Sequence, residues 1–145
     1  MTKPPTWFAA VVAVALLWNI VGLLAILADL RQAAADGAAP AAQEQALRAA
    51  RPLWSVAASV VAVVGGTLGC LMLLFRRRES LALLWASLAG VVVQDIGIFA
   101  VAGVGKEAGP VPFILQGLVL AIAIGLVCLA RHAASQGWLM KRGGG

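Results

Sequence analysis

Hydrophobic residues gather in four long, nearly unbroken runs that are separated by more polar segments. The runs cover about residues 7–28, 53–75, 81–104 and 111–130. A helix needs about 20 apolar residues to cross a hydrocarbon core of about 30 Å, so each run is long enough to span a membrane. A transmembrane barrel would instead show alternating apolar and polar residues in segments of about ten. The pattern predicts an all-α fold, a four-transmembrane-helix bundle that forms a single integral membrane domain over residues 1–145.

The composition excludes the other broad classes of protein. Hydrophobic residues make up 62% of the chain and charged residues 12%, whereas soluble domains have about 45–50% and about 25%. A chain of 145 residues has too little interior to bury so many apolar side chains away from water. The first run also exceeds the apolar core of a signal peptide, which is about 7–15 residues long. We therefore expect it to remain as a true span.

Basic residues are distributed unevenly between the two ends of the predicted bundle. Four spans would place both termini and the segment between the second and third runs on one side, which carries seven Lys and Arg residues. The other side, which includes the outer loop 29–52, carries four basic and four acidic residues. Basic residues near span ends are retained in the cytoplasm, so both termini are predicted to be cytoplasmic. The net charge of +5 is then an orientation signal. We expect the lipid bilayer as a partner and no nucleic acid.

Smaller features refine this topology. Within the outer loop, the alanine-rich segment 40–51 predicts a short surface helix. Three tryptophans near span boundaries are expected to be anchors at the membrane interface: Trp7, Trp54 and Trp138. Small residues recur every four positions in the second and fourth runs: Ala58, Ala62, Gly66 and Cys70, then Gly117, Ala121 and Gly125. Such stripes predict close helix packing, either within one bundle or in a homodimer.

The chemistry-bearing residues are few. The chain has one histidine, His132, and its two cysteines do not form a C-x-x-C pair. These residues cannot assemble a metal site from the usual ligands, nor a thiol redox motif. The chain also lacks a candidate pair of nucleophile and base. We therefore predict no catalytic residue, no metal, no cofactor and no enzymatic activity.

The most informative polar residue is Asp95, which lies well inside the third run. A carboxyl near the bilayer centre is costly and usually faces a bundle interior or a wet cavity. With a rise of about 1.5 Å per residue, Asp95 lies roughly 4 Å outward of its helix midpoint, Asn19 roughly 2 Å and Gln116 roughly 7 Å. Ser59 falls near the same level, and no Lys or Arg is expected at that depth. Each predicted helix thus contributes one polar residue to the outer half of the membrane.

Two interpretations of these polar residues remain open. In the structural interpretation, Asn19, Asp95 and Gln116 form hydrogen bonds across the bundle, which contribute about 0.6 kcal/mol each on average. In the functional interpretation, Asn19, Gln94, Asp95 and Gln116 bind a substrate in a small polar pocket. A protonatable carboxyl beside amides suits a hydroxylated solute or a proton-coupled step.

Several sequence elements resemble a family of small bacterial inner-membrane proteins. The elements are the Trp-Asn-x-x-Gly motif at residues 18–22, the segment 65–78 and the segment 130–139. The family has members of about this length with four predicted helices, and many of them carry the label "sugar transporter". The resemblance implies the same topology in a bacterial inner membrane and brings no binding residue with it. An aromatic residue often follows the first motif in that family, whereas this chain has Leu24, Ala25 and Ile26 there.

Two functions therefore fit the sequence best. The first is a small-solute, sugar-like transporter or transporter subunit with a polar intramembrane site. Because four helices are few for alternating access and no inverted repeat is visible, such a transporter would require a homo-oligomer. The second is a non-enzymatic accessory or assembly subunit of a larger membrane complex, bound through the glycine-rich faces. A small membrane enzyme ranks third.

Overall fold

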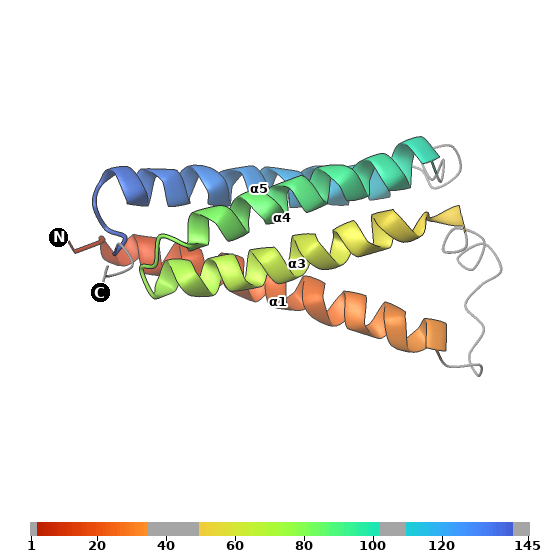
Figure 1. Cartoon of the computed structure of the whole chain (residues 1–145), viewed down its shortest axis with the longest axis horizontal. Helices are drawn as coiled ribbons and strands as arrows, with labels where there is room; N and C mark the ends of the chain where they lie inside the picture. The colour runs from red at the N-terminus through yellow and green to blue at the C-terminus, as the bar shows by residue number, and fades with distance from the viewer. Residues whose placement is uncertain (1–2, 35–49, 102–109, 141–145) are drawn as a thin grey trace.

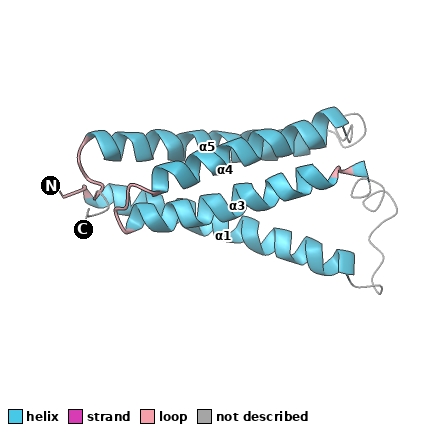
Figure 2. Cartoon of the chain, in the orientation of Figure 1, coloured by secondary structure: helices cyan, strands magenta, loops and turns pink. Residues whose placement is uncertain are grey.

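The computed structural model describes residues 3–34, 50–101 and 110–140. Four long helices run side by side: α1 (Thr6–Ala34), α3 (Leu53–Leu74), α4 (Ser80–Asp95) and α5 (Val111–Ser135), with α4 continued by the π-helix η1 (Ile96–Val101) (Figure 1). Apart from short turns and loops, every described segment is helical (Figure 2). In these ranges, four helices are long and apolar enough to cross a membrane, counting α4 and η1 together. The predicted all-α four-helix bundle is confirmed.

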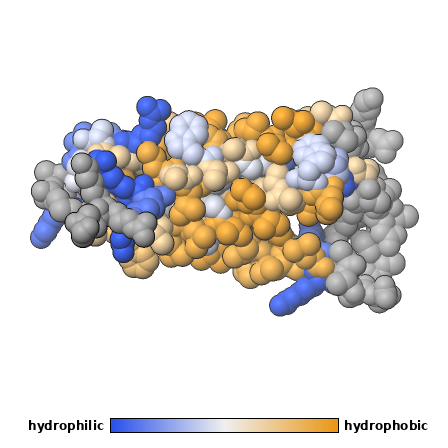
Figure 3. All heavy atoms as spheres, viewed as in Figure 1, coloured by the Kyte–Doolittle hydropathy of each residue, from blue (hydrophilic) through white to orange (hydrophobic). Residues whose placement is uncertain are grey.

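The distribution of polar side chains follows the bundle axis. The first residues of α1, the turn between α3 and α4, and the last residues of α5 lie at one end of the bundle (Figure 1). Hydrophilic side chains gather at this end, whereas hydrophobic side chains cover the face between the two ends (Figure 3). This is the arrangement that a lipid bilayer requires of a helical bundle.

The helices differ in detail from the predicted runs. Helix α1 continues to Ala34 and so takes up the first residues of the predicted outer loop 29–52. Helix α5 continues to Ser135, five residues past the predicted end of its span. The third predicted span, 81–104, is helical as far as it is described, but its last part widens into a π-helix. The predicted surface helix 40–51 falls almost entirely outside the described residues.

Helices α3 and α4 pack most closely because small residues line their contact. A methyl group on Gly90 would lie 2.8 Å from both the carbonyl oxygen of Ala58 and the backbone nitrogen of Ala62. The Ser87 hydroxyl on α4 donates to the Ala62 carbonyl at 2.5 Å. The predicted stripe on α3 is therefore confirmed as a packing surface within the bundle. The predicted stripe on α5 faces outward, since a methyl group at Gly117 or Gly125 would meet nothing within 4 Å.

The segment after α5 turns back and closes one end of the bundle. Trp138 is only 9% exposed, and its ring lies edge-on to Phe8 and His132. Its carbonyl accepts a 2.8 Å bond from Nε of Arg76, whose φ of 58° is left-handed. The expectation that Trp138 is an interface anchor is therefore wrong. Its ring fills space between helix ends and packs against side chains of the protein.

Helix α1 is the least buried of the four. Only 6% of its most apolar window is buried inside the protein, against 44% for α3. It packs on α3 near its N-terminal end and separates from it toward its C-terminal end (Figure 1). Contact between α1 and α5 is sparse. The separation leaves space inside the bundle.

Candidate binding site inside the bundle

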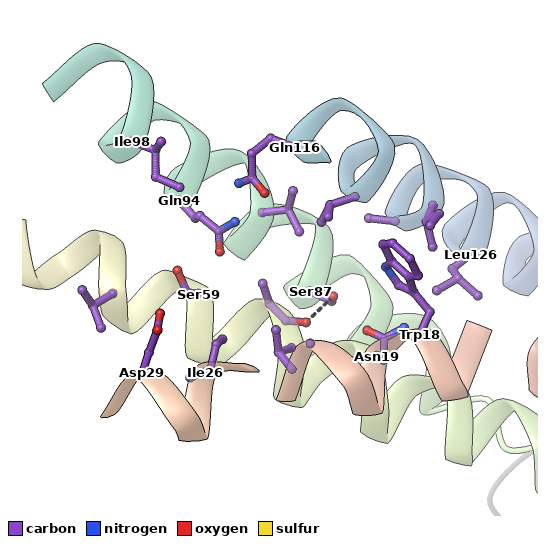
Figure 4. A pocket seen from close by; sticks show the side chains of 18 of the residues that line it. Trp18, Asn19, Ile26, Asp29, Ser59, Ser87, Gln94, Ile98, Gln116 and Leu126 are labelled. Atoms are coloured by element: carbon purple, nitrogen blue, oxygen red, sulfur yellow. Dashed lines mark hydrogen bonds between the residues drawn. The ribbon is translucent and has the colours of Figure 1, made fainter. Parts of the chain in front are cut away.

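A cavity of about 290 Å³ lies between all four helices. Most of its lining is apolar, including Val63, Val91 and Val119. Polar side chains reach it from all four helices and from the residue before Pro52: Asn19, Asp29, Arg51, Ser59, Ser87, Gln94 and Gln116. All of these except Arg51 are labelled in Figure 4. A mostly apolar cavity with a few convergent polar groups is the usual form of a small-molecule site.

One face of α1 forms a long wall of the cavity. Trp18, Gly22, Ile26 and Asp29 recur at three- or four-residue intervals and therefore share a helix face. Gly22 faces α3, and a methyl group there would make an ordinary van der Waals contact with Val63 at 3.7 Å. Trp18 is 40% exposed and lines the cavity. The sequence interpretation treated it only as part of a motif and missed it as a site residue.

Two amides enter the cavity from α4 and α5. Gln94 and Gln116 extend toward the same region from neighbouring helices (Figure 4). Nε2 of Gln116 donates a 2.7 Å hydrogen bond to Oδ1 of Asp95. Asp95 itself is half-buried and does not line the cavity. It acts on the site through Gln116, by fixing the orientation of that amide.

Asn19 lies elsewhere in the same cavity, away from the two glutamines (Figure 4). Its Nδ2 donates to the Ala15 carbonyl at 2.8 Å and to Sγ of Cys70 at 3.9 Å. Its side-chain oxygen packs against Gly66, where a methyl group would collide with it. The structure thus joins Gln94, Asp95 and Gln116 at one place and directs Asn19 toward α3. Asn19 therefore does not join the hydrogen bond between Asp95 and Gln116.

Arg51 is a second residue, besides Trp18, that the sequence interpretation missed as a site residue. It was assigned to the outer loop, yet its guanidinium lines the cavity and Nη2 donates to Oγ of Ser59 at 3.0 Å. Ser59 donates in turn to the Ser55 carbonyl at 3.0 Å. The expectation that no basic residue reaches the level of Ser59 is therefore wrong. Arg51 directly precedes Pro52 and the start of α3, and a long side chain at this place can fold back along the first two turns of the helix. Its place in the sequence could therefore have predicted the contact with Ser59.

The π-helix η1 adjoins the site. Gly97 packs against Ser55, and a methyl group on Gly97 would collide with that side chain. Oγ of Ser55 donates to the Gln94 carbonyl at 3.3 Å, and Ile98 of η1 lines the cavity. On the other side, Phe99 stacks on Phe113 of α5 with ring centroids 4.5 Å apart. Short π-helical turns occur frequently at functional sites because they change the face that a helix presents.

The arrangement suits recognition by hydrogen bonding. In the part of the chain that the structure describes, no group of three His, Cys, Asp or Glu residues could hold a metal ion. Cys70 is buried and Cys128 exposed, and both are free thiols.

No family model, curated protein or solved structure matches this chain. Fold and cavity together define a helical protein with four helices of membrane-spanning length and an internal, partly polar cavity.

Proposed function

We propose that this protein is a multi-pass protein of a bacterial cytoplasmic membrane that binds a small polar solute between its helices. It acts as a small-solute, sugar-like transporter or as the membrane subunit of one. The observation that carries the proposal is the cavity, in which polar side chains from four helices surround one space of about 290 Å³. A dry packing contact would leave no such volume.

The lining supports a hydroxylated solute in particular. The amides of Gln94 and Gln116 each offer a donor and an acceptor, which match hydroxyl groups. Asn19 also lines the cavity, but its amide nitrogen donates to Ala15 and Cys70. Trp18 adds an aromatic ring, and the valines and isoleucines supply the apolar remainder. Asp95 holds Gln116 in place at 2.7 Å and serves as a positioning residue.

Solute binding can be tested with purified protein in nanodiscs of phosphatidylcholine. We expect a panel of hexoses, polyols and sugar phosphates to contain a compound that binds in titration calorimetry. Gln116→Leu should weaken that binding at least about fivefold, since a buried hydrogen bond from the solute loses its partner (about 1–3 kcal/mol). Thr67→Val is the matched control, because Thr67 bonds only its own helix at the Val63 carbonyl and lies outside the cavity. Equal binding by all three proteins would contradict the proposal, as would binding of no compound.

The orientation proposed for the bundle places both termini in the cytoplasm. The supporting feature is charge: Arg76, Arg77, Arg78 and Arg131 are at the end of the bundle where α1 begins. Basic residues at span ends stay on the cytoplasmic side. A fluorescent protein fused to the C-terminus should fluoresce, and alkaline phosphatase at the same position should be inactive. The opposite pair of results would reverse the orientation.

Transport by four helices requires more than one copy of the chain. The face of α5 that carries Gly117 and Gly125 is available for such assembly, since its small residues meet no other helix. Sizing in mild detergent should therefore find a homo-oligomer. A strictly monomeric particle would leave solute binding in place and remove the transport part of the proposal.

The same outward stripe favours a second candidate, an accessory subunit of a larger membrane complex. In that case α5 would bind a different protein, and the cavity would serve only packing. Affinity purification from the native membrane should then recover one stable partner that is lost in Gly125→Leu. The transporter proposal predicts instead that the tagged chain recovers copies of itself.

A further inference from the structure

The cavity contains a cationic group, the guanidinium of Arg51, and one of its N–H donors has no acceptor among the described residues. Arg51 is half-buried beside the first turn of α3, and Nη2 donates to Ser59. Its Nε is buried and has no hydrogen-bond partner among the described residues. Because a guanidinium stays protonated and has five N–H donors, several donors remain for another group.

Few acidic side chains lie near Arg51 among the described residues. Asp29 of α1 also lines the cavity, but it is exposed and makes an interaction of its own. Its exposed carboxylate is screened by water more strongly than the half-buried guanidinium. Asp95 is turned toward α5, where it accepts from Gln116. A buried charge without a counter-ion is costly, so an anion in the cavity would relieve that cost.

We propose that the cavity selects solutes that carry an anionic group, a phosphate or a carboxylate, which is bound by Arg51 and Ser59. The guanidinium donates to the anion from its free N–H groups, and the Ser59 hydroxyl turns from the Ser55 carbonyl to the same oxygen atoms. The remainder of the solute lies between Trp18, Gln94 and Gln116. This inference rests on the proposed solute-binding function and names its substrate class.

The anionic group could belong to a dissolved solute or to the headgroup of a lipid. Both present the same oxygen atoms to the guanidinium. Contact between α1 and α5 is sparse, so a lipid and a dissolved solute are both candidate sources of the anion. The experiment therefore includes dissolved anionic probes and an anionic lipid.

The experiment compares four probes: glucose, glucose 6-phosphate, inorganic phosphate and phosphatidylglycerol. Native mass spectrometry from a neutral detergent resolves bound solute and bound lipid by their masses, and calorimetry in phosphatidylcholine nanodiscs gives affinities for the dissolved probes. We expect glucose 6-phosphate to bind at least about tenfold more tightly than glucose, since hydrogen bonds to charged groups are worth about 1.5–3 kcal/mol. Arg51→Gln should abolish this difference. Arg51→Lys should retain part of it.

Arg78→Gln is the matched control, because it removes the same charge from an exposed site at the other end of the bundle. It should bind all probes as the parent chain does. Thermal unfolding of each variant checks the fold. If Arg51→Gln does not fold, Arg51→Lys and Ser59→Ala give the answer, since both keep the packing and weaken anion binding.

The outcomes separate the two proposals. If glucose and glucose 6-phosphate bind equally in both the parent chain and Arg51→Gln, anion selection is wrong and solute binding stands. If no dissolved probe binds but phosphatidylglycerol binds in an Arg51-dependent manner, the anion site is supported and its source is lipid. In that case the function proposed for dissolved solutes is wrong. If no probe binds at all, both proposals are overturned.

Discussion

The side-chain amide of Gln116 on α5 donates a hydrogen bond of 2.7 Å to Oδ1 of Asp95 on α4. Gln116 lines the cavity and Asp95 stands behind it. The carboxyl therefore positions an amide and does not need to touch a solute. This relationship gives Asp95 a role that lies between the two interpretations of its intramembrane position.

Substitutions at Asp95 should separate positioning from direct binding. Asp95→Asn keeps a side-chain oxygen that accepts from Gln116, so we expect solute affinity within about twofold of the parent chain. Asp95→Ala removes the acceptor and should lower both the free energy of unfolding, by about 1 kcal/mol, and the affinity. Calorimetry and unfolding under matched lipid conditions measure both. A loss of binding in Asp95→Asn as complete as in Asp95→Ala would show that the carboxyl itself contacts the solute.

A glycine pair tests the packing of the bundle. In Gly90→Ala the new methyl group would lie 2.8 Å from the backbone of α3, so α3 and α4 must separate. Such overpacking should cost about 1–3 kcal/mol of unfolding free energy. In Gly125→Ala the methyl group meets nothing within 4 Å. That variant should be neutral or gain up to about 1 kcal/mol from helix propensity. Equal effects in thermal unfolding would contradict this packing.

A tryptophan pair tests the closed end of the bundle. Trp138 is 9% exposed and contacts Phe8 and His132, whereas Trp85 on α4 is 48% exposed. Trp138→Ala should lower the unfolding free energy by about 3–5 kcal/mol, as the loss of a buried aromatic side chain does. Trp85→Ala should have a much smaller effect. Limited proteolysis near the C-terminus offers a second measurement, since the freed segment would be cut earlier in Trp138→Ala.

An alanine pair on α5 tests whether the cavity is the binding site. Ala123 lines the cavity and Ala121 is exposed. Ala123→Phe should fill much of the free space and abolish solute binding with little change in unfolding temperature. Ala121→Phe adds the same side chain on the outer face and should bind normally. Unimpaired binding by Ala123→Phe would place the solute elsewhere.

The fold was largely predictable because the long apolar runs indicate that each helix is surrounded by lipid and not by water. Runs of about 20 apolar residues have few structural solutions in a bilayer, so four helices followed directly. The packing stripe at Ala58, Ala62 and Gly66 was also readable, since small residues are needed wherever backbones meet. At Gly117 and Gly125 no helix of the same chain meets the stripe, so packing in a homodimer stays a prediction there.

The candidate site was predictable only in part. Depth along a helix placed Asn19, Asp95 and Gln116 near one level, but depth contains no information on rotation about the helix axis. Asn19 therefore turned out to face Cys70 and Gly66 instead of the glutamines. Arg51 was assigned to a loop because its backbone lies before α3, whereas its long side chain folds back to Ser59. The distance that a side chain spans and the rotation of a helix about its axis depend on tertiary packing. Neither can be read from a single sequence.

Binding of a dissolved solute in the cavity requires above all that water reaches it. Two adjacent residues of α5 decide this, because Val119 lines the cavity and Leu118 is exposed on the outer face of the bundle. Each is replaced by cysteine in a Cys128→Ala background, and membranes are treated with a small, charged, water-soluble thiol reagent. The account predicts that Val119→Cys reacts, that a bound solute protects it, and that Leu118→Cys in the lipid does not react. Failure of Val119→Cys to react, or equal reaction at both positions, would contradict it.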